Sequence, residues 1–239
     1  DTRPRHDDRK LASLGIRVYE SKRLKLYTDI DPAIAKTLPA FVDAAYDAWV
    51  DYFGPLPPDR ERAEFQMTGY LMSGKPLFRE AGLIPANLPD FINGRHRGAE
   101  FWMVDSKFDY YRRHLMIHEA THCYMTILGG PLPPVWYMEG MAELFGTHRI
   151  EKDGKISFRV MPENQSDYAG LGRIQFVRDE VAAGREKTLD EVLAIRPVDF
   201  VRNDAYAWSW TLCRFLDGHP RWRKPFRQLS GRLTYREFR

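Results

Sequence analysis

The sequence predicts an α+β fold, with a mixed β-sheet in the N-terminal part and a mostly helical C-terminal part. Segments with strand-like composition all lie before Lys107, and helical spacing of apolar residues dominates after it. The 239 residues are 44% hydrophobic, which is enough for one domain with a substantial core. We therefore expect a single domain over residues 14–239, preceded by a flexible arm at residues 1–13.

The elements of the first half follow from apolar spacing and turn residues. The arm is charged and poor in apolar residues, as mobile termini are. Apolar residues recur at helical spacing over Pro32–Phe53, and Gly54-Pro55 ends this helix. Strands are expected at Ile16–Glu20, Leu24–Tyr27, Phe65–Met72 and Gly98–Asp105, with helix and turns over Gly74–Pro89.

The second half is expected to be helical. A long helix over Phe108–Leu128 ends at Gly129-Gly130, and Pro133-Pro134 opens the next helix, because proline is tolerated in a first turn. The further helices are expected at Val135–Gly146, Ser166–Ala183, Leu189–Ile195 and Ala205–Leu216.

Charge and hydropathy exclude two classes of partner. The net charge is +3, from 36 basic and 33 acidic residues, which gives no broad nucleic-acid signal. No apolar run approaches the roughly 20 residues of a membrane span. The basic run Arg221–Arg239 is expected to be a solvated face, with a patch for an acidic partner as the alternative.

Two cysteines, Cys123 and Cys213, give no disulfide framework, and we expect two buried thiols. The chain begins with Asp, as a processed chain does, so we expect a secreted, periplasmic or cell-envelope protein. The cytoplasm is the alternative. Nothing in the sequence indicates the oligomeric state.

The segment His118-Glu119-Ala120-Thr121-His122 carries the chemistry. Positions i and i+4 lie on one face of a helix, so both imidazoles can point at one ion. Neutral imidazole is a good zinc ligand. Glu119 borders the same cavity and can take a proton from metal-bound water, so we expect a zinc site with Glu119 as general base.

Catalytic zinc usually has three protein ligands and an open position. A third histidine six residues after His122 is excluded, because Leu128 occupies that position. A carboxylate on the next helix is the other scheme. Glu139 and Glu143 are four residues apart and share a face, so spacing alone leaves the choice between them open.

Small residues beside these glutamates, Gly140 and Ala142, are expected to let the two helices approach closely.

The His-Glu-x-x-His motif and the following segment Trp136–Glu143 together resemble the gluzincin metallopeptidases, and most closely the peptidase MA-like group of bacterial domains. A late helix that includes Tyr206–Leu212 is similar to one in that group. The resemblance implies a zincin-like fold, zinc held by His118, His122 and Glu139, and a peptide or protein substrate. It also implies that Glu143 orients a ligand histidine.

The resemblance leaves endo- and exopeptidase activity open. Aminopeptidases of this clan carry a Gly-x-Met-x-Asn loop, which is not found over Gly94–Asp105.

Other residues have weaker claims to a role. Tyr206 is the first candidate for an oxyanion donor, with an ordinary core tyrosine as the alternative, and Tyr168 and His148 follow. The remaining histidines are expected to be surface or packing residues: His6, His96, His114 and His219.

We therefore expect a zinc-dependent hydrolase, in which Glu119 assists the attack of zinc-bound water on a peptide bond. One alternative is a catalytically inactive zincin-fold module that binds or scaffolds, and another is a non-peptidase metallohydrolase. Glu119 favours an enzyme, because a purely structural site does not need a base.

Overall fold

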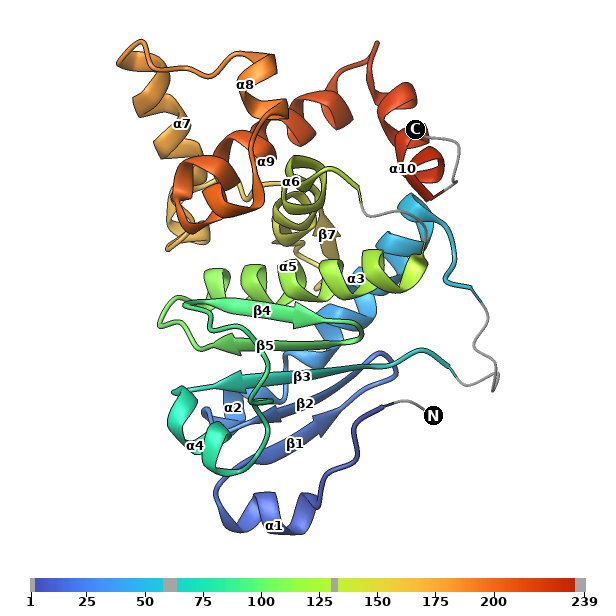
Figure 1. Cartoon of the computed structure of the whole chain (residues 1–239), viewed down its shortest axis with the longest axis vertical. Coiled ribbons are helices and arrows are strands. Elements are labelled where there is room, and N and C mark those ends of the chain that lie inside the picture. The colour runs from blue at the N-terminus through green and yellow to red at the C-terminus, as the bar shows by residue number, and fades with distance from the viewer. Residues whose placement is uncertain (1–2, 58–63, 130–132, 235–239) are drawn as a thin grey trace.

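A five-stranded mixed β-sheet forms the lower part of the molecule in Figure 1. The computed structural model describes residues 3–57, 64–129 and 133–234. Strands β2, β3 and β5 run parallel to one another, and β1 and β4 pair antiparallel at the two edges. In spatial order the strands are β1 (Arg17–Glu20), β2 (Leu24–Thr28), β3 (Met67–Met72), β5 (Glu100–Val104) and β4 (Gly94–Arg97). The α+β class and the mixed sheet are as expected.

Side chains of the central strands alternate between two apolar layers. In β5, Phe101 and Met103 belong to the cluster that contains the long helices, whereas Trp102 belongs to the cluster on the opposite face. Leu26 and Tyr27 of β2 divide in the same way. Both faces of the sheet are therefore covered, which explains why all six residues of β3 are buried.

Helices α3 and α5 pack on one face of the sheet, and α6 and α9 lie beyond α5 (Figure 1). The opposite face is covered by α1 and α4. The α-helices are α1 (Asp8–Ser13), α2 (Pro32–Ala35), α3 (Pro39–Phe53), α4 (Lys75–Glu80), α5 (Asp109–Leu128), α6 (Val135–Gly146), α7 (Arg173–Ala182), α8 (Leu189–Leu193), α9 (Asn203–Gly218) and α10 (Arg223–Thr234). The shorter elements are the 3-10 helices η1 (Gln165–Tyr168) and η2 (Pro197–Val201), and the paired strands β6 (His148–Ile150) and β7 (Ile156–Phe158).

The N-terminal segment differs from the flexible arm that was expected over residues 1–13. Residues 8–13 form α1, whose N-terminus is capped by the Asp7 carboxylate. Leu11 is buried against the sheet, and His6 Nε2 lies 2.8 Å from the Tyr70 hydroxyl oxygen. One cap and one apolar anchor hold this charged segment in place. Residues 1–2 of the expected arm lie outside the described part of the chain.

Later elements depart from the expectation at specific residues. The helix expected over 166–183 is interrupted around Gly170, which has a φ of 89°. The basic run at the C-terminus includes α10, and Arg227 of this helix pairs with the buried Asp217 at 2.8 Å. Part of the run is therefore structural and not only solvated. Residues 235–239 of the run lie outside the described residues.

Two expectations about composition agree with the structure. Cys123 and Cys213 are both buried and free. Within residues 3–57, 64–129 and 133–234, no helix combines the length and apolarity needed to cross a bilayer.

Candidate metal centre

Helix α5 presents His114, His118 and His122 at intervals of four residues, so the three imidazoles lie one turn apart on one side. The helix carries Asp109 in its first turn, and it ends at Gly129, whose φ of 84° suits glycine. All three imidazoles are buried. His114 and His118 face α6, and His122 lies between α6 and the edge strand β4, so polar neighbours and not the apolar core surround them.

Helix α6 carries Glu139 and Glu143, four residues apart, on the side that faces α5. Three ligand atoms meet there. His118 Nε2 lies 3.1 Å from His122 Nε2, and Glu139 Oε2 lies 3.3 Å and 3.2 Å from these two nitrogens. The Glu139 side chain is 19% exposed, so this group reaches solvent on one side. It can hold a metal ion.

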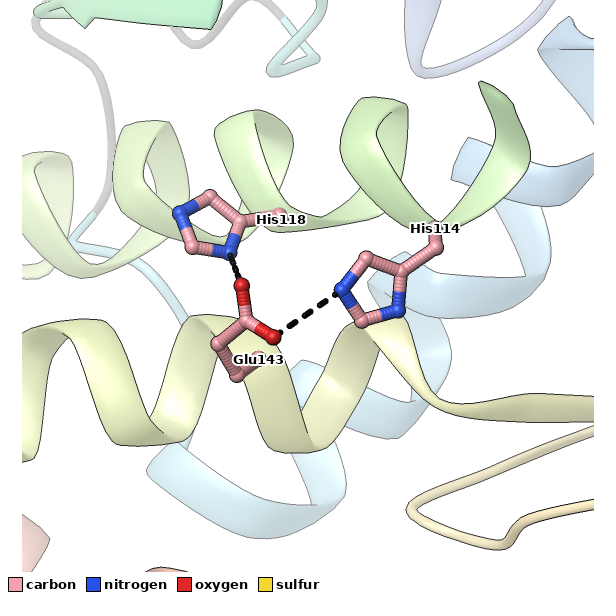
Figure 2. Close-up of side chains that lie close together, drawn as sticks. All are labelled: His114, His118 and Glu143. Atoms are coloured by element: carbon pink, nitrogen blue, oxygen red, sulfur yellow. Dashed lines mark ion pairs between the residues drawn. The ribbon is translucent and has the colours of Figure 1, made fainter. Parts of the chain in front are cut away.

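A second group shares His118 through its other ring nitrogen. His118 Nδ1 lies 3.2 Å from Glu143 Oε1, and His114 Nε2 lies 3.3 Å from Glu143 Oε2. Figure 2 shows the Glu143 carboxylate between the two imidazoles, with one oxygen directed at each. These three buried side chains could also hold a metal ion.

Arg173, at the start of α7, distinguishes the two groups. Its Nε and Nη2 donate to Glu143 Oε2 and Oε1 at 2.9 Å and 3.1 Å, and its Nη1 donates to Asn203. The Glu143 group therefore already holds a buried cation, and a metal ion there would be repelled. Among the described residues no arginine or lysine pairs with Glu139, and a metal ion can displace a proton from an imidazole but not the Arg173 guanidinium, so the group that contains Glu139 is the better metal site.

The two carboxylates control the charge of His118. Burial lowers the pKa of an imidazole, but Glu139 and Glu143 beside His118 raise its pKa to about 10. Burial lowers the pKa of His122. Burial alone would raise the pKa of Glu143, but Arg173 and the neighbouring imidazoles hold it well below its usual range. Burial would also raise the pKa of Glu139, but His122 and His118 lower it. Both glutamates are therefore anionic at neutral pH, and in the metal-free protein they stabilise the proton on His118.

Glu119 is buried, and its carboxylate lies against the edge strand β4. A β-carbon added to Gly94 would overlap Glu119 Oε1, so only glycine allows the strand to lie this close. His96 Nδ1 lies 3.7 Å from Glu119 Oε2. Glu119 thus borders the metal site without belonging to the set of ligand atoms.

Tyr206 of α9 lies on another side of His118. The centroids of the two rings are 6.0 Å apart, and the Arg173 guanidinium lies over the Tyr206 ring at 5.1 Å. The Tyr206 hydroxyl makes no hydrogen bond to any described residue. Burial and the nearby carboxylates raise its pKa, so the hydroxyl stays protonated and can donate.

His148 and Tyr168, the weaker candidates for a donor, lie elsewhere, around Tyr110. His148 stacks on Tyr110 at 4.5 Å, and its Nδ1 lies 2.8 Å from the Gly146 carbonyl oxygen. Burial lowers its pKa to about 3, so it is a neutral packing residue. Tyr168 packs edge-on against the same tyrosine. Both residues follow the end of α6, which leads the chain away from the ligand group.

From the sequence, Gly140 was expected to let α5 and α6 approach closely, and this expectation was wrong about which helix Gly140 contacts. Gly140 does not face α5; a β-carbon there would lie 2.5 Å from the Ser209 carbonyl oxygen of α9. The glycine that meets α5 is Gly146, where a β-carbon would lie 2.8 Å from His114 Cε1. One residue along a helix rotates the side chain by about 100°, so the neighbour of a glutamate faces another helix.

Three residues near the site were not recognised from the sequence. His96 and His114 were expected to be surface or packing residues, but His96 lies beside Glu119 and His114 beside Glu143. The spacing of His114, four residues before His118, was the available signal. Arg173 had none, because it reaches Glu143 across 30 residues of sequence. His6 and His219 lie apart from the site, as expected.

No model of a known protein family matches this chain, and no curated protein matches it.

Proposed function

We propose that this protein is a zinc-dependent hydrolase of the gluzincin metallopeptidase type, with His118, His122 and Glu139 as ligands. The observation that carries the proposal is the convergence of their three ligand atoms. Ligands bound tetrahedrally at about 2.0–2.1 Å from zinc are about 3.3–3.4 Å apart. The three separations here, 3.1, 3.2 and 3.3 Å, are close to that value. Two imidazoles and one carboxylate leave one position of a tetrahedron open, as in catalytic zinc sites.

The arrangement of elements also supports a zincin-like fold. The ligand histidines lie on a long helix that packs under a mixed sheet, and an antiparallel edge strand runs beside that helix. The third ligand comes from the next helix, and the helical part of the chain follows it. This is the order that the resemblance to gluzincins implies.

A zinc ion held by His118, His122 and Glu139 would supply positive charge that acidifies water and polarises a carbonyl oxygen. Glu119 would act as the general base that accepts a proton from the attacking water and passes it to the leaving amine. Glu143 Oε1, 3.2 Å from His118 Nδ1, favours a proton on Nδ1, which leaves the Nε2 lone pair free for the metal. Tyr206 would donate a hydrogen bond from its hydroxyl group to the oxygen on which negative charge develops.

The open edge of β4 favours a peptide over other electrophiles. Among the described strands, β4 pairs only with β5, so its outer backbone groups are available to an extended chain. Gly94 of this strand lies against Glu119. A peptide paired with β4 would thus pass the proposed base.

The test combines metal analysis with one substitution. Protein purified without chelators should contain one zinc per chain and cleave members of a peptide library. Glu119→Gln should keep the zinc and lose hydrolysis, because an amide cannot accept the proton. Glu186→Gln, an exposed change of the same kind, is the control. Protein that carries no transition metal, or Glu119→Gln that loses the metal, would overturn the assignment.

A further inference from the structure

Edge strand β4 passes close to two functional groups of the proposed site. Gly94 and His96 are two residues apart, so they point to the same side of the strand. Gly94 lies against the Glu119 carboxylate, and His96 follows it along the same side of α5. The His96 side chain is 28% exposed, so it stands at the boundary between the buried ligands and solvent.

The His96 ring touches both the ligand helix and the proposed base. It stacks on the ring of His122, with centroids 4.5 Å apart and planes inclined by 24°. Its Nδ1 lies 3.7 Å from Glu119 Oε2, and within the described part of the chain this carboxylate is its sole side-chain polar contact. An imidazole with free donor capacity is therefore held beside a buried carboxylate.

His96 is not one of the ligands. The groups of described residues whose ligand atoms converge include His122 and Glu139 but not His96. A ring that stacks face to face on His122 directs its nitrogens sideways, past that residue's Nε2. Its contribution must therefore act through its two neighbours.

We propose that His96 is a positioning residue that holds both His122 and Glu119 in their working orientations. Stacking restricts rotation of the His122 ring and so keeps Nε2 directed at the ligand group. Nδ1–H donates to Glu119 after a side-chain rotation that closes the present distance to hydrogen-bond range, about 2.7–3.2 Å. The strand that would bind substrate thereby also sets the geometry of the metal site. This inference rests on the proposed hydrolase function.

Two substitutions separate the contributions of the ring and of the donor. His96→Phe keeps an aromatic ring over His122 and removes the donor. His96→Gln keeps a donor near Glu119 and removes the ring. His219→Gln, which changes a histidine that lies apart from the site, is the matched control. Thermal melting of each variant without metal checks that the fold is retained.

Two measurements are made on each variant. Competition with a chelator gives the zinc affinity, and hydrolysis of a peptide that the parent cleaves gives kcat and KM. His96→Phe should bind zinc within about threefold of the parent and lose about tenfold in kcat with KM unchanged. His96→Gln should bind zinc about tenfold more weakly and keep most of the kcat once loaded. The visible spectrum of the cobalt-substituted protein should change in His96→Gln and not in His96→Phe.

The inference is overturned if both variants match the parent in zinc affinity, cobalt spectrum and kcat. That result would leave the proposed function intact, because the parent would still bind zinc and cleave peptide. A parent that binds no zinc would instead overturn the proposed function, and this inference with it.

Discussion

Two groups of side chains share His118, and they have opposite properties. On its Nε2 side, Glu139 and His122 form a group that, among the described residues, contacts no arginine or lysine and has one side open to solvent. On its Nδ1 side, Glu143 and His114 form a fully buried group that already contains the charge of Arg173. The same residue types thus form one group that is suited to a metal ion and a second group in which Arg173 already balances the charge of the carboxylate. Predictions that separate the two groups test this reading.

The largest expected difference is in metal binding. Glu139→Ala removes a ligand and should abolish measurable zinc binding, whereas Glu143→Ala removes only a partner of His118. Loss of such a partner typically weakens metal binding about 10–100-fold. Chelator competition on both variants measures the difference. A Glu143 variant that binds zinc more weakly than the Glu139 variant would reverse the two roles.

The free energy of unfolding of the metal-free protein should fall more in Glu143→Ala than in Glu139→Ala, which is the opposite order. Glu143→Ala leaves the Arg173 guanidinium buried without a carboxylate, and breaking a buried pair typically costs about 3–5 kcal/mol. Arg173 and Glu143 side chains are 11% and 3% exposed, so water cannot replace the pair. Glu139→Ala should cost less, because its partner His118 keeps Glu143 as a second carboxylate and can also lose its proton, which a guanidinium cannot. Denaturant unfolding of both metal-free variants measures the two free energies.

Tyr206→Phe tests whether the group formed by His118, His122 and Glu139 is catalytic. Loss of one oxyanion donor typically costs about 100–1,000-fold in rate, or roughly 3–4 kcal/mol. Zinc content and melting temperature should stay at the parent level, because the ring and its contact with Arg173 remain. Steady-state kcat on a cleaved peptide is the measurement. A rate within about threefold of the parent would return Tyr206 to the status of a packing residue.

The smallest expected effect is a pH dependence of the metal-free protein. The pKa of His118 is raised from 6.5 to about 10, so its contribution to stability is complete below pH 6.5 and is lost as pH rises toward 10. The pKa of Glu143 is lowered, so its contribution is lost as pH falls below about 4.5. The metal-free melting temperature should therefore be highest between these limits.

Zinc should reverse the alkaline slope, because protons compete with the metal for His118. Melting curves at several pH values, with and without zinc, compare the two forms. Equal slopes in both would place the metal away from His118.

The predictable part of the site is the part built from local spacing. The pair His118 and His122 follows from one helical turn, and the return of the chain after Gly129 brings Glu139 beside them. Strand β4 was missed because Gly94–Arg97 contains no apolar residue, so it shows no strand alternation. Pairing with β5, and not the composition of the segment, makes it a strand.

Long-range pairs account for the rest of what was missed. The contact between Arg173 and Glu143 depends on where α7 packs, and nothing near either residue in the sequence indicates it. Gly140 shows the same limit in another form. Its small size correctly indicated a close helix contact, but the spacing did not say that α9 was the partner.

The open edge of β4 also has a consequence for solubility. An unpaired strand edge that can accept a peptide can equally accept the same strand of a second copy, which is a route to aggregation. The two side chains that alternate with Gly94 and His96 are Arg95 and Arg97, and both are exposed. If two copies paired their β4 strands antiparallel about His96, Arg95 would lie opposite Arg97, and the repulsion would oppose that pairing. The charges on the outer side of the strand can thus keep its edge free for substrate.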